Sequence, residues 1–469
     1  MEKILLINPP YNLEVYKENK NFSVHPPVGL AYLASFIKKY GYGVEIIDAN
    51  ALNISKEKLI DLIINHPSGI IGFTSVTATI NLVCQICDKV KEKSDKVLII
   101  GGQHATFKAE EVLAGCKSID YIVRGEGEMT LLRLLHRLKI NKSAKGLMGI
   151  TYSENNKIIS TPPRPPITDI NKIPFPAWEL LPRSKYRLNG FQDIGFQGEQ
   201  LGKLISTRGC PNKCTFCSSA YFWGKPRFRN VDNIFEELVF LTQELKVRHI
   251  DFMDDCLTIP VSRFRALCNR IIENNMNFKW SCYSRVQNIN EELVQLMKKA
   301  GCFMVLLGIE SGNQEIINTI KKNITLEQVT NAVKLFKKYD IDCLGFFMIG
   351  LPDDTEATVH ETVNFAKKLN LDFPFFSVTT PFPGTELYDW FMSSNLSPRN
   401  FEWNQLSTHG ATIYRTENLS SAEIKKLYDY AIKKCYLDPA FIVKLFIKII
   451  KNPYKLTRYW KLFRTFINV

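Results

Sequence analysis

Three cysteines near the middle of the chain have the spacing of iron–sulfur ligands. Cys210, Cys214 and Cys217 form a Cx3Cx2C pattern directly after an expected strand. Thiolates are the usual ligands of [4Fe–4S] clusters, and three of them leave the fourth iron open to an outside ligand. A structural zinc site is the alternative, but zinc in such sites takes four protein ligands, and no fourth partner lies nearby in the sequence. The pattern therefore predicts a [4Fe–4S] cluster with one open iron.

Alternating strands and helices surround this motif and must position it. Between residues 201 and 390 the pattern shows six βα units, which predict a partial (β/α)6 barrel. Ligand sites of βα barrels lie at the C-terminal ends of the strands, where the cysteines stand. The strands are expected at Leu204–Thr207, His249–Met253, Phe278–Tyr283, Phe303–Ile309, Cys343–Ile349 and Phe375–Thr379. The helices are expected at Asn233–Glu244, Ser262–Asn274, Glu291–Ala300, Leu326–Tyr339 and Glu356–Leu369.

The first part of the chain has its own alternation, which predicts an α/β domain with a doubly wound, Rossmann-like parallel sheet. Ligands of such sheets bind beyond the carboxyl ends of the strands, and these ends are polar or glycine-rich here. The strands are expected at Ile4–Asn8, Val44–Asp48, Ile70–Thr74, Val97–Ile100 and Tyr121–Arg124. The helices are expected at Gly29–Lys39, Lys56–Asn65, Ile80–Lys93, Phe107–Ala114 and Thr130–Leu138.

Four regions follow from these patterns. Residues 1–145 carry the first sheet, and residues 146–200 form a hairpin and a proline-rich connector, since proline fixes φ and removes a donor. Residues 201–390 carry the barrel. Residues 391–469 are expected to be mostly helical and to end in a basic amphipathic tail.

Composition excludes several classes of protein. The 469 residues are 45% hydrophobic and 23% charged, which is typical of globular proteins and excludes general disorder. The sequence shows neither a signal peptide nor the ~20 consecutive apolar residues of a membrane span, so a cytoplasmic protein is expected. The net charge is +13, but a basic tail is a weaker sign of nucleic-acid binding than a basic stripe across a domain. No nucleic-acid partner is expected.

The cysteine motif and its place at a strand end resemble the radical S-adenosylmethionine (SAM) superfamily, over about residues 201–385. The resemblance implies that SAM binds the open iron and is cleaved to a 5′-deoxyadenosyl radical. Phe216 matches the aromatic residue that shields the cluster. By the same resemblance, residues at the ends of the second, fourth and fifth strands would bind SAM. They are Asp254, Asp255, Gly308, Glu310, Ser311, Ile349 and Gly350.

The N-terminal region resembles the cobalamin-binding module found in one branch of that superfamily. Ser75-Val76-Thr77 and Gly101-Gly102 match its serine and double-glycine elements, whose small residues admit the dimethylbenzimidazole tail of cobalamin. The loop that carries a cobalt-ligating histidine in the best-known cobalamin proteins reads Asp48-Ala49-Asn50 here, so no lower cobalt ligand from that loop is expected. The implied cobalamin contacts are Pro9, Asp48, Asn50, Ser75, Thr77, Gly101, Gly102, His104 and Glu126.

These resemblances imply a cobalamin-dependent radical SAM enzyme with three cofactors, namely a [4Fe–4S] cluster, SAM and cobalamin. The expected activity is methyl transfer to an unactivated carbon, or to phosphorus, through the deoxyadenosyl radical and methylcobalamin. Oxidative cyclisation or rearrangement is the alternative, because such enzymes share every motif quoted above. A cobalamin-binding sensor with an inactive barrel is a third hypothesis, and the intact cysteines beside Glu310 argue against it.

An organic substrate and an electron donor such as flavodoxin or ferredoxin are the expected partners. The C-terminal stretch from Pro439 places apolar residues and lysines at helical spacing, with seven basic residues and no acid. Such a helix can pack on its own protein or lie on an anionic membrane surface. Peripheral membrane contact through this tail is therefore one of two hypotheses for the segment.

Overall fold

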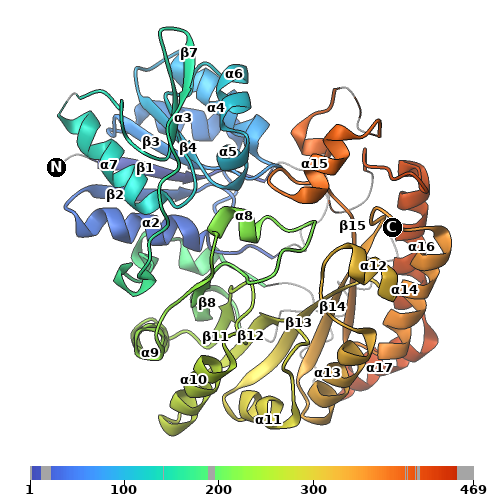
Figure 1. Ribbon diagram of the computed structural model, residues 1–469. Helices are drawn as coiled ribbons and strands as arrows, with labels where there is room; N and C mark the ends of the chain where they lie inside the picture. The colour runs from blue at the N-terminus through green and yellow to red at the C-terminus, as the bar shows by residue number, and fades with distance from the viewer. Residues whose placement is uncertain are drawn as a thin grey trace.

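The computed structural model describes residues 3–11, 23–140, 142–188, 196–396, 398, 400–406, 408 and 412–451. Its N-terminal half is a seven-stranded sheet in the order β2-β1-β3-β4-β5-β6-β7 (Figure 1). β1 to β5 run parallel, and β6 and β7 add an antiparallel hairpin. The strands are β1 (Lys3–Asn8), β2 (Gly43–Asp48), β3 (Ile70–Thr74), β4 (Val97–Gly101), β5 (Tyr121–Val123), β6 (Ile150–Glu154) and β7 (Lys157–Ser160).

Helices cover both faces of this sheet, which explains why its parallel strands are nearly continuous apolar runs. Side chains of one face pack against α2 (Val28–Lys39) and α7 (Gly127–Lys139). The other face packs against four helices. They are α3 (Lys56–Asn65), α4 (Ile80–Lys91), α5 (Gln103–Phe107) and α6 (Ala109–Gly115).

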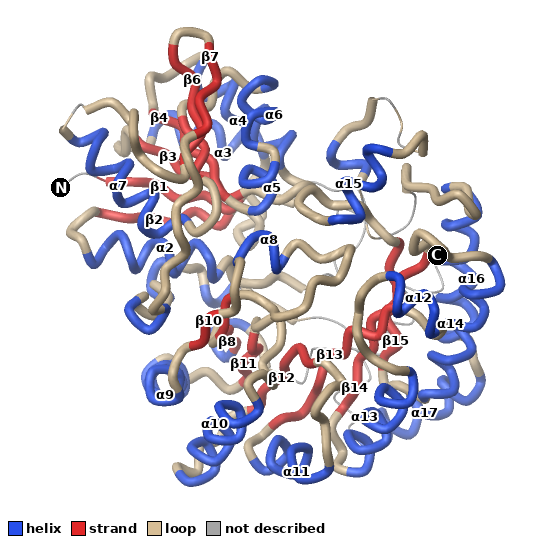
Figure 2. The backbone as a smooth tube through the Cα atoms, viewed as in Figure 1, coloured by secondary structure: helices blue, strands red, loops and turns tan. Residues whose placement is uncertain are grey.

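The second half is a parallel six-stranded sheet whose strands lie in chain order, with helices on its outside (Figure 2). The sheet does not close, so the predicted partial barrel is confirmed. Its strands are β8 (Leu201–Leu204), β11 (His249–Phe252), β12 (Lys279–Ser284), β13 (Cys302–Glu310), β14 (Asp342–Ile349) and β15 (Phe373–Val378). The outer helices are α9 (Val231–Val239), which continues through Phe240–Glu244, α10 (Val261–Glu273), α11 (Glu291–Lys299), α13 (Leu326–Lys338) and α14 (Glu356–Leu369).

The first barrel strand lies earlier than the sequence predicts. It ends at Leu204, whereas Leu204–Thr207 was the expected strand. The reason is Asp254, which accepts hydrogen bonds from the backbone N–H groups of Ser206 and Thr207 and so draws the chain out of the sheet. The chain then forms β9 (Thr207–Arg208), which pairs with β10 (Arg227–Phe228) instead.

Shorter elements join and close the two halves. The short helices are α8 (Ser219–Trp223), which lies between the halves in Figure 1, α12 (Gln314–Thr319) and α15 (Glu386–Ser393); two longer helices, α16 (Ser421–Tyr436) and α17 (Pro439–Lys451), follow the barrel. Short 3-10 turns lie at Ile170–Lys172, Trp178–Leu180, Arg183–Lys185, Gly198–Gln200 and Trp403–Gln405. No helix in the described part of the chain has the length and apolar character needed to cross a membrane.

One extended segment, residues 23–27, is called the strap below. Val24 of the strap pairs antiparallel with Arg187, with N–H···O distances of 2.8 and 3.1 Å. Val24 also shares the barrel core with Leu188 and with Leu201 of β8. Val24, His25 and Pro26 line a small cavity together with Leu201, Gly202 and Lys203 of β8, so the strap packs beside the first barrel strand.

Candidate functional site

The cysteine loop leaves the barrel at β9, and its first residues are held by a buried carboxylate. Asp254 accepts hydrogen bonds from Ser206 N at 2.8 Å, Ser206 Oγ at 3.0 Å and Thr207 Oγ1 at 2.7 Å, and also from Thr207 N. Both oxygens are therefore occupied by the loop. Asp254, which the sequence assigns to SAM, is placed instead to position the chain that carries the cysteines.

The far end of the loop is fixed to the opposite side of the barrel mouth. Thr215 N donates to the carbonyl of Ile320 at 3.1 Å, and Leu387 N of α15 donates to the carbonyl of Thr215 at 2.8 Å. Arg285, just after β12, lies with Nη1 3.9 Å from Cys214 Sγ. The cysteines thus lie across the C-terminal ends of the barrel strands, as predicted.

Glu310 ends β13 beside this loop and has an unusual backbone. Its φ is +72°, and the register with β14 shifts between Gly308 and Glu310. Its Oε1 is 2.6 Å from Lys322 Nζ, and Lys322 Nζ lies 5.7 Å from the centre of the Phe216 ring. A Cβ on Gly308 would come within 2.5 Å of Lys322 Nζ and 2.6 Å of Glu310 Oε1, so a larger residue there would displace this ion pair. Strained residues of this kind concentrate at functional sites.

The three cysteines fit a cluster better than a single ion. Cys217 N donates to the carbonyl of Cys214 at 3.1 Å, so these two cysteines lie in one turn, and burial raises the pKa of Cys217 to about 11. Among the described residues, however, no three His, Cys, Asp or Glu side chains converge on one metal ion. In a [4Fe–4S] cluster each cysteine binds a different iron, so convergence on one point is not required. The zinc alternative loses support.

Of the other predicted SAM contacts, one side chain is exposed, and two residues make hydrogen bonds within the fold. Asp255 is exposed and accepts a 2.5 Å hydrogen bond from Ser219 Oγ of α8, two residues after Cys217, so its carboxylate lies beside the cysteine loop. Ser311 is buried and bonded to Thr362 Oγ1 at 3.1 Å, which makes its role structural. Gly350 turns the chain after Ile349 with φ +87°, and its N–H donates to Asp354 at 3.0 Å.

A cavity of about 390 Å³ opens at the carboxyl ends of the N-terminal strands. Four predicted cobalamin contacts line it, namely Pro9, Gly101, Gly102 and Glu126. Two glycines keep it open. A Cβ on Gly102 would lie 2.3 Å from the Ser75 carbonyl oxygen, and a Cβ on Gly72 would lie 2.9 Å from the Leu6 side chain. The lining of this cavity is largely apolar, which suits the benzimidazole tail of cobalamin.

The remaining predicted cobalamin residues lie outside this cavity. Asp48 is buried and accepts from Asn8 Nδ2 at 2.8 Å and from the Tyr186 hydroxyl at 3.0 Å, so it joins the sheet to the connector. Asn50 accepts a hydrogen bond from Tyr11 N at 3.4 Å. Ser75 donates to the carbonyl of Gly101 at 3.1 Å. These three side chains therefore support the cavity rather than line it.

Thr77 and His104 also turn away from the cavity and toward each other. His104 Nδ1 and Thr77 Oγ1 share a hydrogen bond of 3.1 Å, and the imidazole packs edge-on against Trp403, with ring centres 4.6 Å apart. Burial, with a smaller contribution from Lys108, lowers the pKa of His104 to about 4. None of the described residues that line the cavity is a histidine.

Four largely buried charged side chains connect the cavity to the cysteine loop, and the sequence analysis did not identify them as a cluster. This Arg–Glu cluster consists of Glu126 and Glu128 after β5 and Arg208 and Arg227 of β9 and β10. Arg208 Nη2 lies 2.5 Å from Glu128 Oε1, and Arg208 Nη1 lies 3.6 Å from Glu126 Oε2. Arg227 pairs with Glu126 as well. Burial alone would lower the pKa of Arg208, but Glu128 and Glu126 raise it, so the cation is held firmly.

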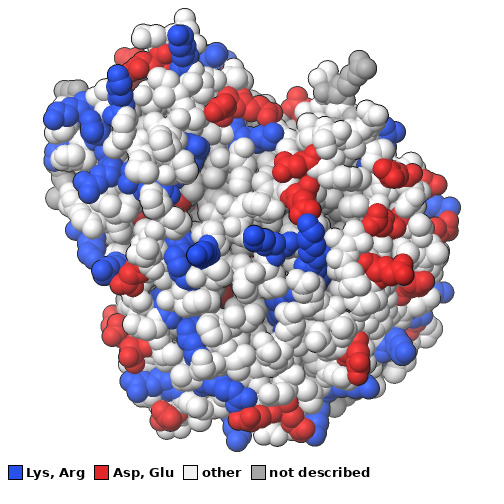
Figure 3. Space-filling view, viewed as in Figure 1, with Lys and Arg blue, Asp and Glu red and all other residues white. Residues whose placement is uncertain are grey.

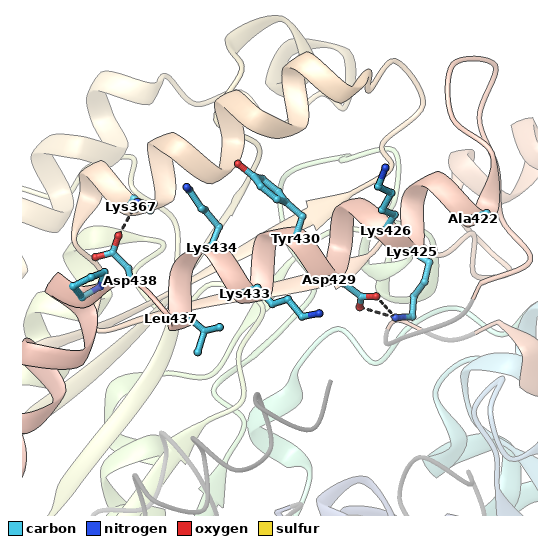
Figure 4. Close-up of a pocket in the computed structure, with 11 residues that line it drawn as sticks. Lys367, Ala422, Lys425, Lys426, Asp429, Tyr430, Lys433, Lys434, Leu437 and Asp438 are labelled. Atoms are coloured by element: carbon cyan, nitrogen blue, oxygen red, sulfur yellow. Dashed lines mark hydrogen bonds and ion pairs between the residues drawn. The ribbon is translucent and has the colours of Figure 1, made fainter.

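A larger recess of about 740 Å³ lies on the outside of α16 and is not part of this site (Figure 4). Lysines dominate its lining, and two of them form ion pairs, Lys367 with Asp438 at 2.7 Å and Lys425 with Asp429. None of the predicted site residues contributes to it. On the face drawn in Figure 3, lysines and arginines gather near the centre beside a group of acidic side chains, and the periphery carries mixed charge.

Comparison with known proteins agrees with this geometry. The radical SAM superfamily model matches residues 204–366, and the B12 binding domain model matches residues 20–135. An uncharacterised methyltransferase of Pyrococcus horikoshii is 35% identical over 94% of each chain. This chain belongs to the radical SAM superfamily. The anaerobic magnesium-protoporphyrin IX monomethyl ester cyclase of Rubrivivax gelatinosus is 30% identical, over 82% of this chain and 69% of the cyclase.

Solved structures show the same fold for this radical SAM protein. The cobalamin-dependent SAM radical enzyme OxsB aligns with a TM-score of 0.72, at 17% identity over 98% of this chain and 72% of OxsB. The radical SAM methyltransferase TsrM of Kitasatospora setae aligns with a TM-score of 0.70, at 17% identity over 94% and 90% of the two chains. These structures confirm the fold, and the two family models and the relatives, taken with them, confirm the predicted family, enzyme class and three cofactors. An enzyme of this class acts on an organic substrate with electrons from a reductant.

Proposed function

We propose that this protein is a cobalamin-dependent radical SAM methyltransferase that methylates an unactivated carbon, or a phosphorus centre, of an organic substrate. The observation that carries the proposal is the Arg–Glu cluster. Glu126 and Glu128 line the cobalamin cavity, and Arg208, which pairs with both, stands two residues before Cys210. The sites for corrin and cluster therefore share one wall. Relatives named as methyltransferases support the same activity.

When bound, the cluster and SAM supply a 5′-deoxyadenosyl radical, and cobalamin supplies the methyl carrier. Cys210, Cys214 and Cys217 would each hold one iron of the cluster. Glu310, fixed by Lys322, and the exposed Asp255 are the side chains proposed to bind polar groups of SAM. The apolar walls of the cavity exclude water from the reacting centres.

Oxidative cyclisation remains the second candidate, and one observation favours it. The relative that is 30% identical over 82% of this chain is named a cyclase. Product mass separates the two activities, because a methylated product gains one methyl group and a cyclised product does not.

The proposal can be tested before the substrate is known. The full chain would be reconstituted anaerobically with iron, sulfide and cobalamin, reduced, and incubated with SAM carrying a CD3 group. We expect the CD3 group on cobalamin, together with S-adenosylhomocysteine and 5′-deoxyadenosine. Replacing the three cluster cysteines with alanine should abolish 5′-deoxyadenosine, whereas Cys268→Ala, in the α10 core, should not. Absence of methyl transfer to cobalamin by the intact, loaded protein would contradict the proposal.

A flavodoxin or ferredoxin is proposed as the electron donor, and peripheral membrane contact is proposed for α17. Its outer face carries five large apolar side chains, each at least 40% exposed. They are Ile442, Val443, Phe446, Ile447 and Ile450. Lys444 faces inward, 3.2 Å from Asp372, so apolar insertion rather than this lysine would drive contact. Truncation after Leu437 should lower sedimentation with anionic liposomes at low salt, and equal sedimentation would refute the contact.

A further inference from the structure

A second cavity, of about 110 Å³, lies inside the barrel. Lys203, Asp251 and Ser281 stand side by side in register on β8, β11 and β12, so their side chains share one face of the sheet. The opposite face packs on the outer helices, as shown by Trp280, whose ring meets that of Phe264 of α10 at 6.2 Å. The Lys203 row therefore points into the barrel interior and lines the cavity.

The strap contributes one residue to the wall of this cavity. His25 of the strap lines it together with Lys203 and Asp251. His25 Nδ1 is buried and has no hydrogen-bond partner among the described residues. Burial, and then the charge of Lys203, lower the pKa of His25 to about 3, so the imidazole is neutral. The neutral His25 therefore adds no charge that could balance Lys203 or Asp251.

The cavity has two charged side chains, Asp251 and Lys203, and they differ in their hydrogen-bond partners. Asp251 accepts a hydrogen bond from Ser281 Oγ, and its Oδ1 lies 3.1 Å from His249 Nε2. Burial would raise the pKa of Asp251, but His249, Lys203 and Ser281 together hold it well below its usual range. Lys203 is 7% exposed, and Asp251 is the opposite charge that acts on its ammonium, but no hydrogen bond or ion pair of this ammonium is found among the described residues. Burial lowers its pKa to about 8, against the opposing effect of Asp251, so it is mostly charged at neutral pH.

A buried ammonium without an acceptor is costly, and an anionic oxygen group would satisfy it. We propose that this cavity is a subsite for a carboxylate of the organic substrate, with Lys203 as its cation and the Tyr283 hydroxyl as a second donor. The subsite rests on the proposed function, because it presumes a substrate that enters the barrel. One cation suits a monoanion better than a phosphate dianion.

Size and position agree with this subsite. One water molecule needs about 10–15 Å³ of such a cavity, so 110 Å³ is large enough for a carboxylate. The cavity reaches Met253 and Tyr283, toward the carboxyl ends of β11 and β12. A substrate anchored at Lys203 would therefore extend toward Asp255 and the cysteine loop. Burial, and then Asp251, raise the pKa of Tyr283 to about 12, which keeps its hydroxyl a donor.

Acetate is the probe for the test. The full chain without SAM would be heated in sodium acetate, acetamide, sodium phosphate or sodium chloride at matched ionic strength. We expect a saturable rise of Tm with acetate only, because a ligand that binds the folded state stabilises it. Lys203→Met should weaken acetate binding at least tenfold, while Lys225→Met, at an exposed lysine, should bind as the wild type does.

The line width of 13C-acetate in the NMR spectrum gives a second measurement, with Tyr283→Phe as a milder variant that should weaken binding severalfold. An unchanged acetate response in both variants would overturn the subsite, as would an equal response to acetamide or a saturable response to phosphate. None of these measurements needs turnover. Failure of methyl transfer and failure of the subsite are therefore distinguishable.

Discussion

Glu128→Gln should destabilise the protein through the Arg–Glu cluster. The Glu128 side chain is 6% exposed, and its Oε1 lies 2.5 Å from Arg208 Nη2. Removing one partner of a buried ion pair costs about 3–5 kcal/mol, because the other charge stays buried. Arg208 keeps Glu126 at 3.6 Å, so we expect about 3 kcal/mol, the lower end of that range. Glutamine preserves the volume and one hydrogen bond, so the effect isolates the charge.

Denaturant unfolding of the full chain measures this change. Glu111→Gln is the matched control, since it removes a surface pair with Lys108 of 3.3 Å and should change stability by less than about 1 kcal/mol. The variant should also alter the absorption spectrum of bound cobalamin, because Glu128 lines the cavity. If both variants unfold at the same denaturant concentration with unchanged cobalamin spectra, the Arg–Glu cluster does not join the two cofactor sites.

Three further predictions concern the cofactors and the pH dependence of stability. Replacing the three cluster cysteines with alanine should abolish iron binding and SAM cleavage but leave cobalamin bound; a full [4Fe–4S] complement in this variant would contradict the assignment. Because no described residue lining the cobalamin cavity is a histidine, the cobalt(II) protein should give a base-off EPR spectrum, and a nitrogen triplet splitting would refute this. The pKa of His104 is about 4 in the folded protein, below its unfolded value, so the unfolded chain takes up the proton first as pH falls. Wild-type protein should therefore lose about 3 kcal/mol more stability than His104→Asn between pH 7 and pH 4, and the exposed control His136→Asn should match the wild type.

Elements with strong local signals could be predicted from the sequence. The strand Ile70–Thr74 and the helices Lys56–Asn65 and Glu356–Leu369 have the expected bounds. The strand is a buried apolar run, and each helix begins after a capping residue, Ser55 or Thr355, whose side chain accepts from the third helical N–H. These signals lie within a few residues of the element they define.

The roles of polar residues at strand ends could not be predicted in the same way. Asp254, Ser311 and Asp48 stand where ligands bind, but their partners come from other elements, namely Ser206, Thr362 and Tyr186. A polar residue at a strand end serves the ligand or the fold according to what lies opposite it. Only the three-dimensional structure shows this.

The buried lysine of β8 was missed for a related reason. Lys203 interrupts an apolar run, so the sequence pattern predicts the strand at Leu204–Thr207, after the lysine. Its burial depends on the strap and on β11, which are remote in sequence. The signal in the sequence is the lysine itself, because a charged residue inside a buried strand indicates a functional role.

The open barrel has a consequence for how the protein can be divided. Unpaired edge strands can pair with other chains and cause aggregation. The strap packs beside β8, and at the other edge α16 lies on β15, where the Tyr436 hydroxyl donates to the carbonyl of Pro374 at 2.7 Å. Neither the strap nor α16 belongs to residues 201–390. Produced alone, that segment would present two bare edges, so the smallest piece expected to stay monomeric must include both the strap and α16.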